Sequence, residues 1–300
     1  MKVVLVTGAS GFVGHQVVRA LTARGGVEVH GVARRGAVLA GAVPHRVDVL
    51  DAGARNALLS SVPADTLIHC AWTVEHGRFW TEPANRDWVS ATTALIQRFV
   101  ELGGRRVVGI GSMAEYDWTT PQPLSETATP LNPSTLYGQS KLSLFQRFSE
   151  PAGTAPSTIA WVRLFNMFGE REDPRRLVPY VIRSLLAGET AKCTHGRQIR
   201  DYLDVREVGR AIAAVAASSV TGAVNVASGQ PVRQGDVVDC IGRIVGRPDL
   251  IALGAVPAAV GEPTALEADV TRLTREVGYT PDADLERDLL AAVLYWRRAA

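Results

Sequence analysis

The sequence is poor in several kinds of residue, and each shortage excludes a class of protein. It has only three cysteines, Cys70, Cys193 and Cys240, which lack the spacing of metal ligands and need not pair. This usage suits a reducing compartment, so we expect a cytoplasmic protein that holds no metal. The sequence shows neither a signal peptide nor a hydrophobic run long enough to cross a bilayer, so we expect no membrane partner.

An excess of charge of either sign is also missing. The 32 basic and 30 acidic residues nearly cancel, which leaves a formal net charge of +2. No overall field would attract nucleic acid or an anionic membrane surface, so we expect neither as a partner. Lysine occurs only as Lys2, Lys141 and Lys192 while arginine is abundant, so a lysine within a motif carries more weight.

The N-terminal stretch MKVVLVTGASGFVG organises the rest of the chain. Residues 3–6 form a short aliphatic run typical of a buried strand, and residues 16–23 have the pattern of an amphipathic helix. Between them stand Gly8, Gly11 and Gly14, which would let the backbone approach a pyrophosphate at the helix N-terminus. The spacing G-x-x-G-x-x-G differs from the commoner G-x-G-x-x-G, and three glycines could form only a turn. Their place directly after a strand favours a dinucleotide site.

A second strand, predicted over residues 27–33, ends where the adenosine ribose of a dinucleotide should arrive. Enzymes that use NAD usually place Asp or Glu there to accept from the ribose 2′-hydroxyl, whereas NADP needs cations for its 2′-phosphate. The sequence offers Arg34 and Arg35 and no acid. A solvated basic turn is the alternative, but we expect NADP(H) in preference to NAD(H).

Strands then alternate with helices, which predicts an α/β fold with a Rossmann-type, doubly wound parallel sheet. A third strand over residues 43–49 carries Asp48, whose side chain could bind an adenine amino group. A helix over residues 52–59 leads to a fourth strand over residues 65–70, in which we interpret His69 as structural.

An aromatic loop over residues 72–83 leaves the carboxyl end of the fourth strand, the edge at which such sheets bind ligands. Trp72, His76, Phe79 and Trp80 are therefore candidates for a lid over a substrate, unless they merely pack on the surface.

A long helix predicted over residues 85–102 has two apolar faces, one of which includes Ile96. One face would meet the sheet and the other a partner subunit. Together with a helix over residues 134–148, which carries Leu144 and Phe148, it predicts a homodimer joined by a four-helix bundle.

A serine, a tyrosine and a lysine complete the pattern. Ser112 follows a fifth strand over residues 106–110, while Tyr137 and Lys141 lie four residues apart on one face of a helix. A Tyr–Lys pair at this spacing is common by chance, but Ser112 and the glycine turn make the combination specific. Tyr116 could approach the same site, although it has no lysine four positions on.

With these residues in place, residues 1–298 resemble the extended short-chain dehydrogenases/reductases, the group of epimerases, dehydratases and ketoreductases that act on nucleotide sugars. The resemblance rests on TGASGFVG, GSMAEYDW, TLYGQSK, RLFNMFG, RDYLDV and NVASG, and within the group it points to sugar 4-ketoreductases. It implies an NADP-binding Rossmann domain over residues 1–165, to which segments near 200–228 return. A smaller α/β domain over residues 166–300 would bind a nucleotide-diphosphate sugar and contain helices near residues 205–218, 234–245 and 285–297.

The resemblance implies roles for single residues. Tyr137 would donate a proton to the carbonyl oxygen of the sugar, and Ser112 would polarise that carbonyl. Lys141, with the positive charge of an oxidised nicotinamide, would lower the pKa of Tyr137, and it would also bond the nicotinamide ribose. Asn166 and Arg200 match positions that hold the diphosphate of the substrate. The expected cofactor contacts are Gly8, Ser10, Gly11, Phe12, Val13, Gly14, Arg34, Arg35, Asp48, Val49, Ala71, Tyr137, Lys141 and Leu164, and the expected substrate contacts are His76, Ser112, Met113, Asn166, Val178 and Arg200.

The residues after Ser112 narrow the reaction. The dehydratases that this chain resembles carry an Asp-Glu pair there, and epimerase-reductases of the fucose type have a cysteine at the place of Ala114. This sequence has Met113 and Ala114, and neither side chain can transfer a proton. We therefore expect NADPH-dependent reduction of the 4-keto group of a nucleotide-linked 4-keto-6-deoxy sugar. The alternatives are a nucleotide-sugar 4-epimerase that keeps NAD bound and a non-catalytic NADP-sensing protein built on the same fold.

Overall fold

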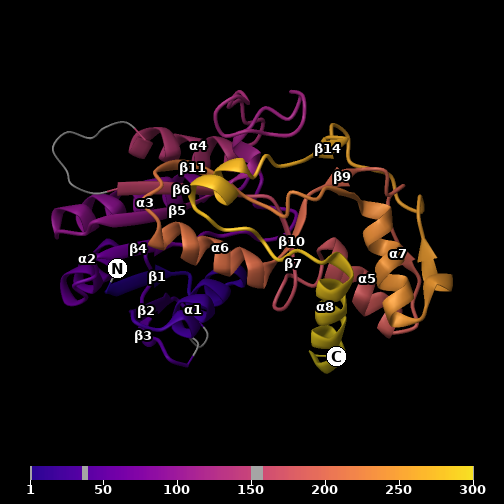
Figure 1. Ribbon diagram of the computed structural model, residues 1–300, viewed down its shortest axis with the longest axis horizontal. Helices are drawn as coiled ribbons and strands as arrows, with labels where there is room; N and C mark the ends of the chain where they lie inside the picture. The colour runs from indigo at the N-terminus through magenta and orange to yellow at the C-terminus, as the bar shows by residue number, and fades with distance from the viewer. Residues whose placement is uncertain (1, 36–39, 150–157, 300) are drawn as a thin grey trace.

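A seven-stranded parallel sheet forms the centre of the molecule. The computed structural model describes residues 2–35, 40–149 and 158–299. Every neighbouring pair of strands in the sheet is parallel, and the strand order runs outward from β1 in both directions, which is the doubly wound arrangement that the sequence predicts (Figure 1). In spatial order the strands are β11 (Gly222–Val226), β6 (Thr158–Leu164), β5 (Arg106–Ser112), β4 (Thr66–His69), β1 (Val3–Thr7), β2 (Glu28–Ala33) and β3 (Val43–Arg46).

Helices bury both faces of this sheet, because successive side chains of a strand point to opposite sides. Val4 and Val6 pack in one apolar cluster and Leu5 in another. The first cluster is closed by two helices that approach closely at Gly209, where a Cβ would lie 2.6 Å from the backbone of Gln16. The helices are α1 (Phe12–Arg24) and α6 (Val205–Ala217) on the first face, and α2 (Ala52–Ser61), α3 (Asn85–Glu101) and α4 (Leu136–Ser149) on the second.

The remaining elements gather beyond the carboxyl end of β6, toward the right of Figure 1. They share an apolar core of their own, to which Val181, Ile182, Val237 and Leu289 belong. The division into two domains at residue 166 stays a prediction. These elements are the strand pairs β7 (Asn166–Phe168) with β10 (Tyr202–Asp204) and β8 (Ala191–Lys192) with β13 (Ile251–Ala252), the strands β12 (Val232–Arg233), β9 (Ile199–Arg200) and β14 (Ala265–Leu266), and the helices α5 (Leu177–Leu186), α7 (Gln234–Val245) and α8 (Leu285–Ala299).

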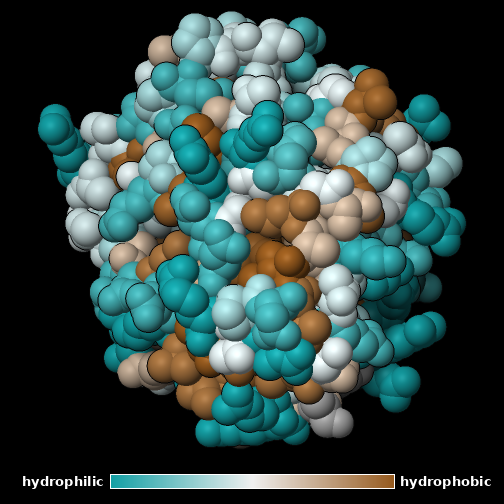
Figure 2. Space-filling view, turned by 90° about the vertical axis from the view of Figure 1, so that its right-hand side faces the viewer, coloured by the Kyte–Doolittle hydropathy of each residue, from teal (hydrophilic) through white to brown (hydrophobic). Residues whose placement is uncertain are grey.

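Figure 2 shows the face that these C-terminal elements form. Hydrophobic residues reach the surface near its centre, and hydrophilic residues surround them. The exposed large hydrophobic residues of this part of the chain are Leu253, Val256, Val260, Leu290 and Leu294. Among the residues that the structure describes, no helix has both the length and the apolar character needed to cross a membrane.

Several predicted elements end at other residues than expected. The third strand stops at Arg46 rather than at residue 49, because its only neighbour, β2, ends at Ala33, the partner of Arg46. The fifth strand runs on to Ser112, since β6 pairs with it through Leu164. The helix expected from residue 134 begins at Leu136, after Thr135 Oγ1 accepts a hydrogen bond from the Gly138 N–H at 3.1 Å.

The helices expected to join two subunits lie side by side within the subunit, as α3 and α4. Ile96 and Leu144, which we expected on the subunit contact, are buried inside the subunit and form no part of an exposed face. This corrects the reasoning behind the homodimer, which itself stays a prediction.

A buried carboxylate connects the end of the large sheet to the C-terminal elements. Asp201, which follows β9, is fully buried. Its Oδ1 accepts hydrogen bonds from the backbone N–H and the hydroxyl of Ser228 at 2.7 and 2.5 Å, and its Oδ2 accepts from the Gly229 N–H at 2.9 Å. Because Ser228 and Gly229 come just after β11, Asp201 fixes how the two parts meet.

Asp201→Ala should therefore destabilise the fold. It removes the acceptor and leaves the buried Ser228 N–H and the partly buried Gly229 N–H without this partner, so we expect the free energy of unfolding to fall by about 3 kcal/mol. Urea unfolding followed by circular dichroism measures this change. Asp239→Ala, at an exposed position of α7, is the control and should change stability by less than about 0.5 kcal/mol. Equal stabilities of the two variants would contradict the assigned role.

Candidate functional site

The glycine turn between β1 and α1 has the shape that a pyrophosphate requires. A Cβ on Gly8, whose φ is +69°, would lie 2.7 Å from the Ala71 nitrogen, and one on Gly14 would lie 2.2 Å from the Gly8 oxygen. Gly11 is the N-cap of α1 and provides no side chain to bind the first N–H groups of the helix. Those groups are therefore available to an anion, so the residues present fit a dinucleotide.

A cavity of about 240 Å³ adjoins this turn and is placed to receive an adenosine. Arg34 Nη1 lies 3.6 Å from Asp48 Oδ2 at its rim, and both side chains are exposed. Of the other expected cofactor contacts, Phe12 and Val13 begin α1 and Leu164 ends β6, and none of the three lines the cavity. The expected contacts that do line it are Gly8, Ser10, Gly11, Arg34, Arg35, Asp48, Val49 and Ala71.

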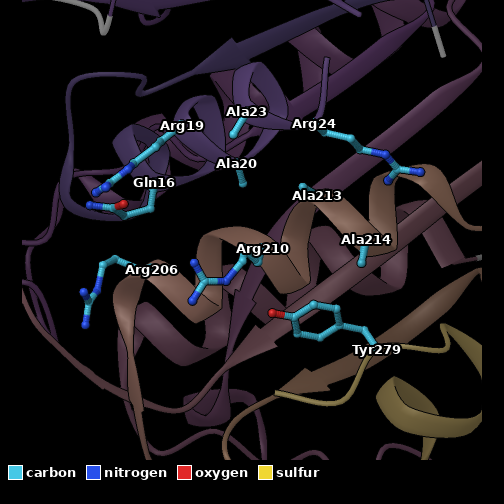
Figure 3. A pocket seen from close by; sticks show the side chains of 10 residues that line it. All are labelled: Gln16, Arg19, Ala20, Ala23, Arg24, Arg206, Arg210, Ala213, Ala214 and Tyr279. Carbon is cyan, nitrogen blue, oxygen red and sulfur yellow. The ribbon is translucent and has the colours of Figure 1, made fainter. Parts of the chain in front are cut away.

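A different cavity, of about 520 Å³, lies between α1 and α6. Figure 3 shows the side chains of Arg19, Arg24, Arg206 and Arg210 around small alanines, with Tyr279 along one side. Arg206 is paired with Asp204 and Asp288, Arg210 with Glu207 and Arg19 with Glu170, so three of these cations already have acidic partners. None of the expected site residues lies here.

Ser112, Tyr137 and Lys141 come together at the carboxyl edge of the sheet. Ser112 is the last residue of β5, and the other two lie on the first turns of α4. All three are buried. Ser112 lies near enough to Tyr137 to lower the pKa of its hydroxyl. Lys141 Nζ donates to the Ile110 carbonyl oxygen at 2.9 Å and lies 3.6 Å from the centroid of the Trp72 ring.

Burial determines the charge states at this site. Desolvation raises the pKa of Tyr137 to about 12, although the neighbouring Ser112 side chain acts in the opposite direction. Desolvation also lowers the pKa of Lys141 to about 7, and the Glu115 carboxylate opposes this. The lowering of the Tyr137 pKa expected from Lys141 does not occur in the chain by itself. The Lys141 ammonium is directed at Ile110 and Trp72 instead, and its Nζ lies 5.8 Å from the centroid of the Tyr137 ring.

The aromatic loop packs against Tyr137 rather than loosely on the surface, and the role of Trp72, Phe79 and Trp80 as a lid over a substrate stays a prediction. Their rings stand edge-on to the ring of Tyr137, with centroids 6.4, 5.0 and 5.8 Å away. The Tyr137 N–H donates to the Trp80 carbonyl oxygen at 3.1 Å, and Trp72 Nε1 donates to Asn85 Oδ1 at 2.8 Å. The loop therefore forms an apolar wall that excludes water from Tyr137.

Tyr116 does not approach the site, contrary to the possibility that its position in the sequence suggests. It is 1% exposed, and its hydroxyl donates to Asn225 Oδ1 of β11 at 2.7 Å. The short helix η1 (Met113–Glu115) that follows Ser112 ends before Tyr116 and leaves its ring in an apolar cluster with Phe165.

His69 has the structural role that we expected. Its Nδ1 lies 2.7 Å from Thr7 Oγ1 and its Nε2 lies 2.9 Å from Thr92 Oγ1. Burial lowers its pKa to about 3, so the ring is neutral and connects β4 to β1 and α3.

The expected substrate contacts are only partly gathered in one place. His76, Asn166 and Val178 line a cavity of about 190 Å³ next to Trp80. Met113 and Arg200 are absent from its lining. Arg200 is 3% exposed, and its Nη2 donates to Glu262 Oε1 and to the Pro263 carbonyl oxygen, both at 2.9 Å. This arginine is therefore occupied by protein groups, and the cavity does not unite it with Asn166.

Two charged residues of this cavity were missed by reasoning from the sequence. Arg176 is the N-cap of α5, and Glu172 lies in the turn before it. Burial raises the pKa of Glu172 to about 8. Asn166 Oδ1, in the same lining, is buried and has no hydrogen-bond partner in the described part of the chain. The charged run EREDPRR between β7 and α5 was the available signal, because it begins where a strand reaches the ligand edge.

Side chains suited to a metal are not clustered in the described residues. No group of three or more His, Cys, Asp and Glu side chains is placed to hold an ion there.

Comparisons with known proteins agree with this geometry. The chain is 26% identical to the dTDP-glucose 4,6-dehydratase of Streptomyces griseus, over 98% of this chain and 94% of the relative. It is 25% identical to the UDP-glucose 4-epimerase of Corynebacterium glutamicum, over 93% of this chain and 90% of the relative. Among solved structures, a UDP-N-acetylglucosamine 4-epimerase from Methanobrevibacter ruminantium M1 superposes with a TM-score of 0.89 at 23% identity, covering 100% of this chain and 99% of that one. MoeE5 in complex with UDP-glucuronic acid and NAD gives a TM-score of 0.86 at 28% identity, covering 99% of both chains.

The profile of one family spans most of the sequence. It is described as the NAD dependent epimerase/dehydratase family and matches residues 4–227. This range contains the glycine turn together with Ser112, Tyr137 and Lys141. The protein therefore belongs to the NAD dependent epimerase/dehydratase family.

Proposed function

We propose that the protein reduces the 4-keto group of a nucleotide-linked 4-keto-6-deoxy sugar with NADPH. The observation that carries this proposal is that Ser112, Tyr137 and Lys141 are buried together at one edge of the sheet, followed by two side chains that cannot transfer a proton. Those side chains are Met113 and Ala114. They supply no acid or base for removing water from the sugar, which separates this chain from the dehydration named for the Streptomyces relative.

The charge states suit the direction of reduction. When bound, the nicotinamide supplies a hydride to the carbonyl carbon. Tyr137, whose pKa is raised to about 12, is protonated at neutral pH and can give its proton to the carbonyl oxygen. Ser112 donates a hydrogen bond to the same oxygen, and Ser112 and the Arg176 guanidinium favour the phenolate that is left behind.

A nucleotide-sugar 4-epimerase is the second candidate, and it is favoured by the 4-epimerases among the relatives. It would use Ser112, Tyr137 and Lys141 in both directions and keep NAD bound through each turnover. Denaturing the purified protein distinguishes the two functions. Release of one equivalent of NAD supports the epimerase, whereas oxidation of added NADPH by a 4-keto sugar nucleotide supports the reductase.

Tyr137→Phe should remove the proton donor while leaving the ring and its packing in place. We expect kcat to fall by about 10²–10⁴-fold in single-turnover reduction, with NADPH affinity nearly unchanged. Near-normal turnover of this variant would mean that the proton comes from another group.

Two further variants act as controls for that experiment. Tyr116→Phe should leave turnover close to normal, because the Tyr116 hydroxyl donates a hydrogen bond to Asn225 and lies away from the site. Lys141→Met should lower kcat and also weaken NADPH binding, since the ammonium is expected to bond the nicotinamide ribose.

The preference for NADPH is supported by Arg34 and Arg35, which follow β2 where no carboxylate stands. Replacing both with Ser should weaken NADPH binding by about 10–100-fold, because charge-assisted bonds to the 2′-phosphate are lost at an exposed site. NADH binding should hardly change. Steady-state kinetics with both cofactors measure this, and equal losses would contradict the assignment.

A homodimer through α3 and α4 is also proposed. The support is that these helices lie side by side and that Leu102, at the end of α3, is 45% exposed. Sedimentation velocity at micromolar concentration should show a species of twice the chain mass, which Leu102→Glu should convert to monomers. A monomeric wild-type protein would refute the dimer.

A further inference from the structure

A fully buried ion pair lies directly behind the catalytic serine, and the mechanism above does not use it. Glu115 and Arg163 have no exposed surface, and Arg163 Nε donates to Glu115 Oε2 at 2.8 Å. Glu115 Oε1 accepts from the Ser112 backbone N–H and from Trp161 Nε1, both at 2.9 Å. The carboxylate therefore has three donors.

This carboxylate fixes the backbone on which the Ser112 hydroxyl is mounted. Ser112 and Glu115 form a capping box: Ser112 Oγ accepts from the Ala114 N–H at 3.2 Å while Glu115 accepts from the Ser112 N–H. A Cβ on Gly111 would lie 2.4 Å from Glu115 Oε1, so the neighbouring backbone is packed against the carboxylate. Glu115 thus fixes the orientation of Ser112 through contacts with the backbone of Gly111 and Ser112.

We propose that Glu115 is a positioning residue for proton transfer, which holds the backbone of Ser112 in place and puts a buried carboxylate at the site that contains Tyr137 and Lys141. This inference rests on the proposed function, because it assigns Glu115 to the same proton-transfer site. Net stability does not explain the pair well, since the desolvation of two buried charges offsets most of their attraction.

The other groups around Lys141 and Tyr137 cannot take over this charge. His69, on β4, has a pKa near 3 and is neutral, and burial raises the pKa of the Cys70 thiol to about 12, so it is neutral as well. On the opposite side, Arg176 at the start of α5 is a cation and lowers the pKa of Tyr137. Among the described groups acting on Lys141, Glu115 alone is a carboxylate, and it is paired with Arg163.

The negative charge of Glu115 determines the direction in which it shifts the pKa values of Lys141 and Tyr137. Glu115 raises the pKa of Lys141 and also raises that of Tyr137. Loss of its charge should therefore move both titrations to lower pH. Lys141 would lose its proton sooner as the pH rises, and the phenolate would form sooner too. A purely structural role would reduce activity without moving either titration.

Lysine NMR tests the charge independently of activity. The chain has only Lys2, Lys141 and Lys192, so ¹³Cε-labelled lysine gives three signals, and Lys141→Met assigns the buried one. Lys2 and Lys192 are exposed and serve as internal references. In the wild type the Lys141 signal should titrate near pH 7. In Glu115→Gln/Arg163→Gln the midpoint should fall by about one unit, because an opposite charge close to the ammonium is lost.

The double variant removes both charges, so no unpaired ion is left in the core, and the amide oxygen introduced at position 115 can still accept from Ser112 and Trp161. Glu126→Gln is the matched control. Its carboxylate is partly buried and, like that of Glu115, accepts a backbone hydrogen bond, from the Asn225 N–H at 2.7 Å, but it does not act on Lys141. The control should leave the Lys141 midpoint in place. Thermal unfolding checks that each variant is folded.

The pH profile of kcat completes the test. With a 4-keto sugar nucleotide and NADPH, the loss of kcat with rising pH should begin at lower pH in the double variant, and Glu115→Leu/Arg163→Leu should in addition lose activity at its optimum. An unchanged Lys141 midpoint in a folded double variant would overturn the proposal. A shifted midpoint in a protein that reduces no such substrate would instead overturn the proposed function while leaving the electrostatic role of Glu115 intact.

Discussion

The site depends on the burial of one tyrosine hydroxyl and one lysine ammonium at the carboxyl edge of the sheet. Once water is excluded, each polar group needs a partner from the protein. Ser112 lies beside the hydroxyl and lowers its pKa, and this position requires β5 to run two residues beyond its predicted end. The Ile110 carbonyl and the face of Trp72 receive the ammonium, which requires the aromatic loop to fold inward over α4. The length of β5 and the course of residues 72–80 are thus consequences of the same burial.

Burial also shifts the pKa values of Tyr137 and Lys141, in opposite directions. In water a tyrosine and a lysine have pKa values within about half a unit of each other. Here the pKa of Tyr137 is raised to about 12 and that of Lys141 is lowered to about 7, so desolvation moves the two apart by stabilising the neutral form of both. The result is a protonated tyrosine beside a lysine whose charge depends on its surroundings. Such a pair is ready to donate a proton, and the anion at Glu115 becomes important because little else holds the lysine in its charged form.

Much of the fold and part of the site could be predicted from the sequence, because those features are local. The aliphatic run of β1, the glycines after it and the alternation of strands and helices each lie within a few residues, and Tyr137 and Lys141 share a helix face by spacing alone. The missing features depend on contacts between distant segments. Glu115 meets Arg163 48 residues later, and Tyr116 points to Asn225 rather than to Tyr137 because a short 3₁₀ helix ends just before it. Hydrophobic periodicity predicts neither the Glu115–Arg163 contact nor the direction of the Tyr116 side chain. Arg200 likewise has its partner at Glu262, 62 residues away, which no motif spacing could reveal.

The residues at the reacting atoms do not distinguish reduction from epimerisation. Ser112, Tyr137 and Lys141 can serve both reactions, since each moves a hydride and a proton between the same kinds of atom, whereas the two differ in whether the cofactor leaves after a turnover. The cavity at the glycine turn bears on that difference. Arg34 stands at its rim in an exposed ion pair with Asp48, and an exposed pair of this kind is weak enough for a phosphate to displace the carboxylate. An entering 2′-phosphate would exchange one anion for another at little cost, while the 2′-hydroxyl of NAD would find no acceptor among the residues that directly follow β2. An exchangeable ligand at the adenosine end is what the proposed reductase requires, because its cofactor must be replaced after each turnover.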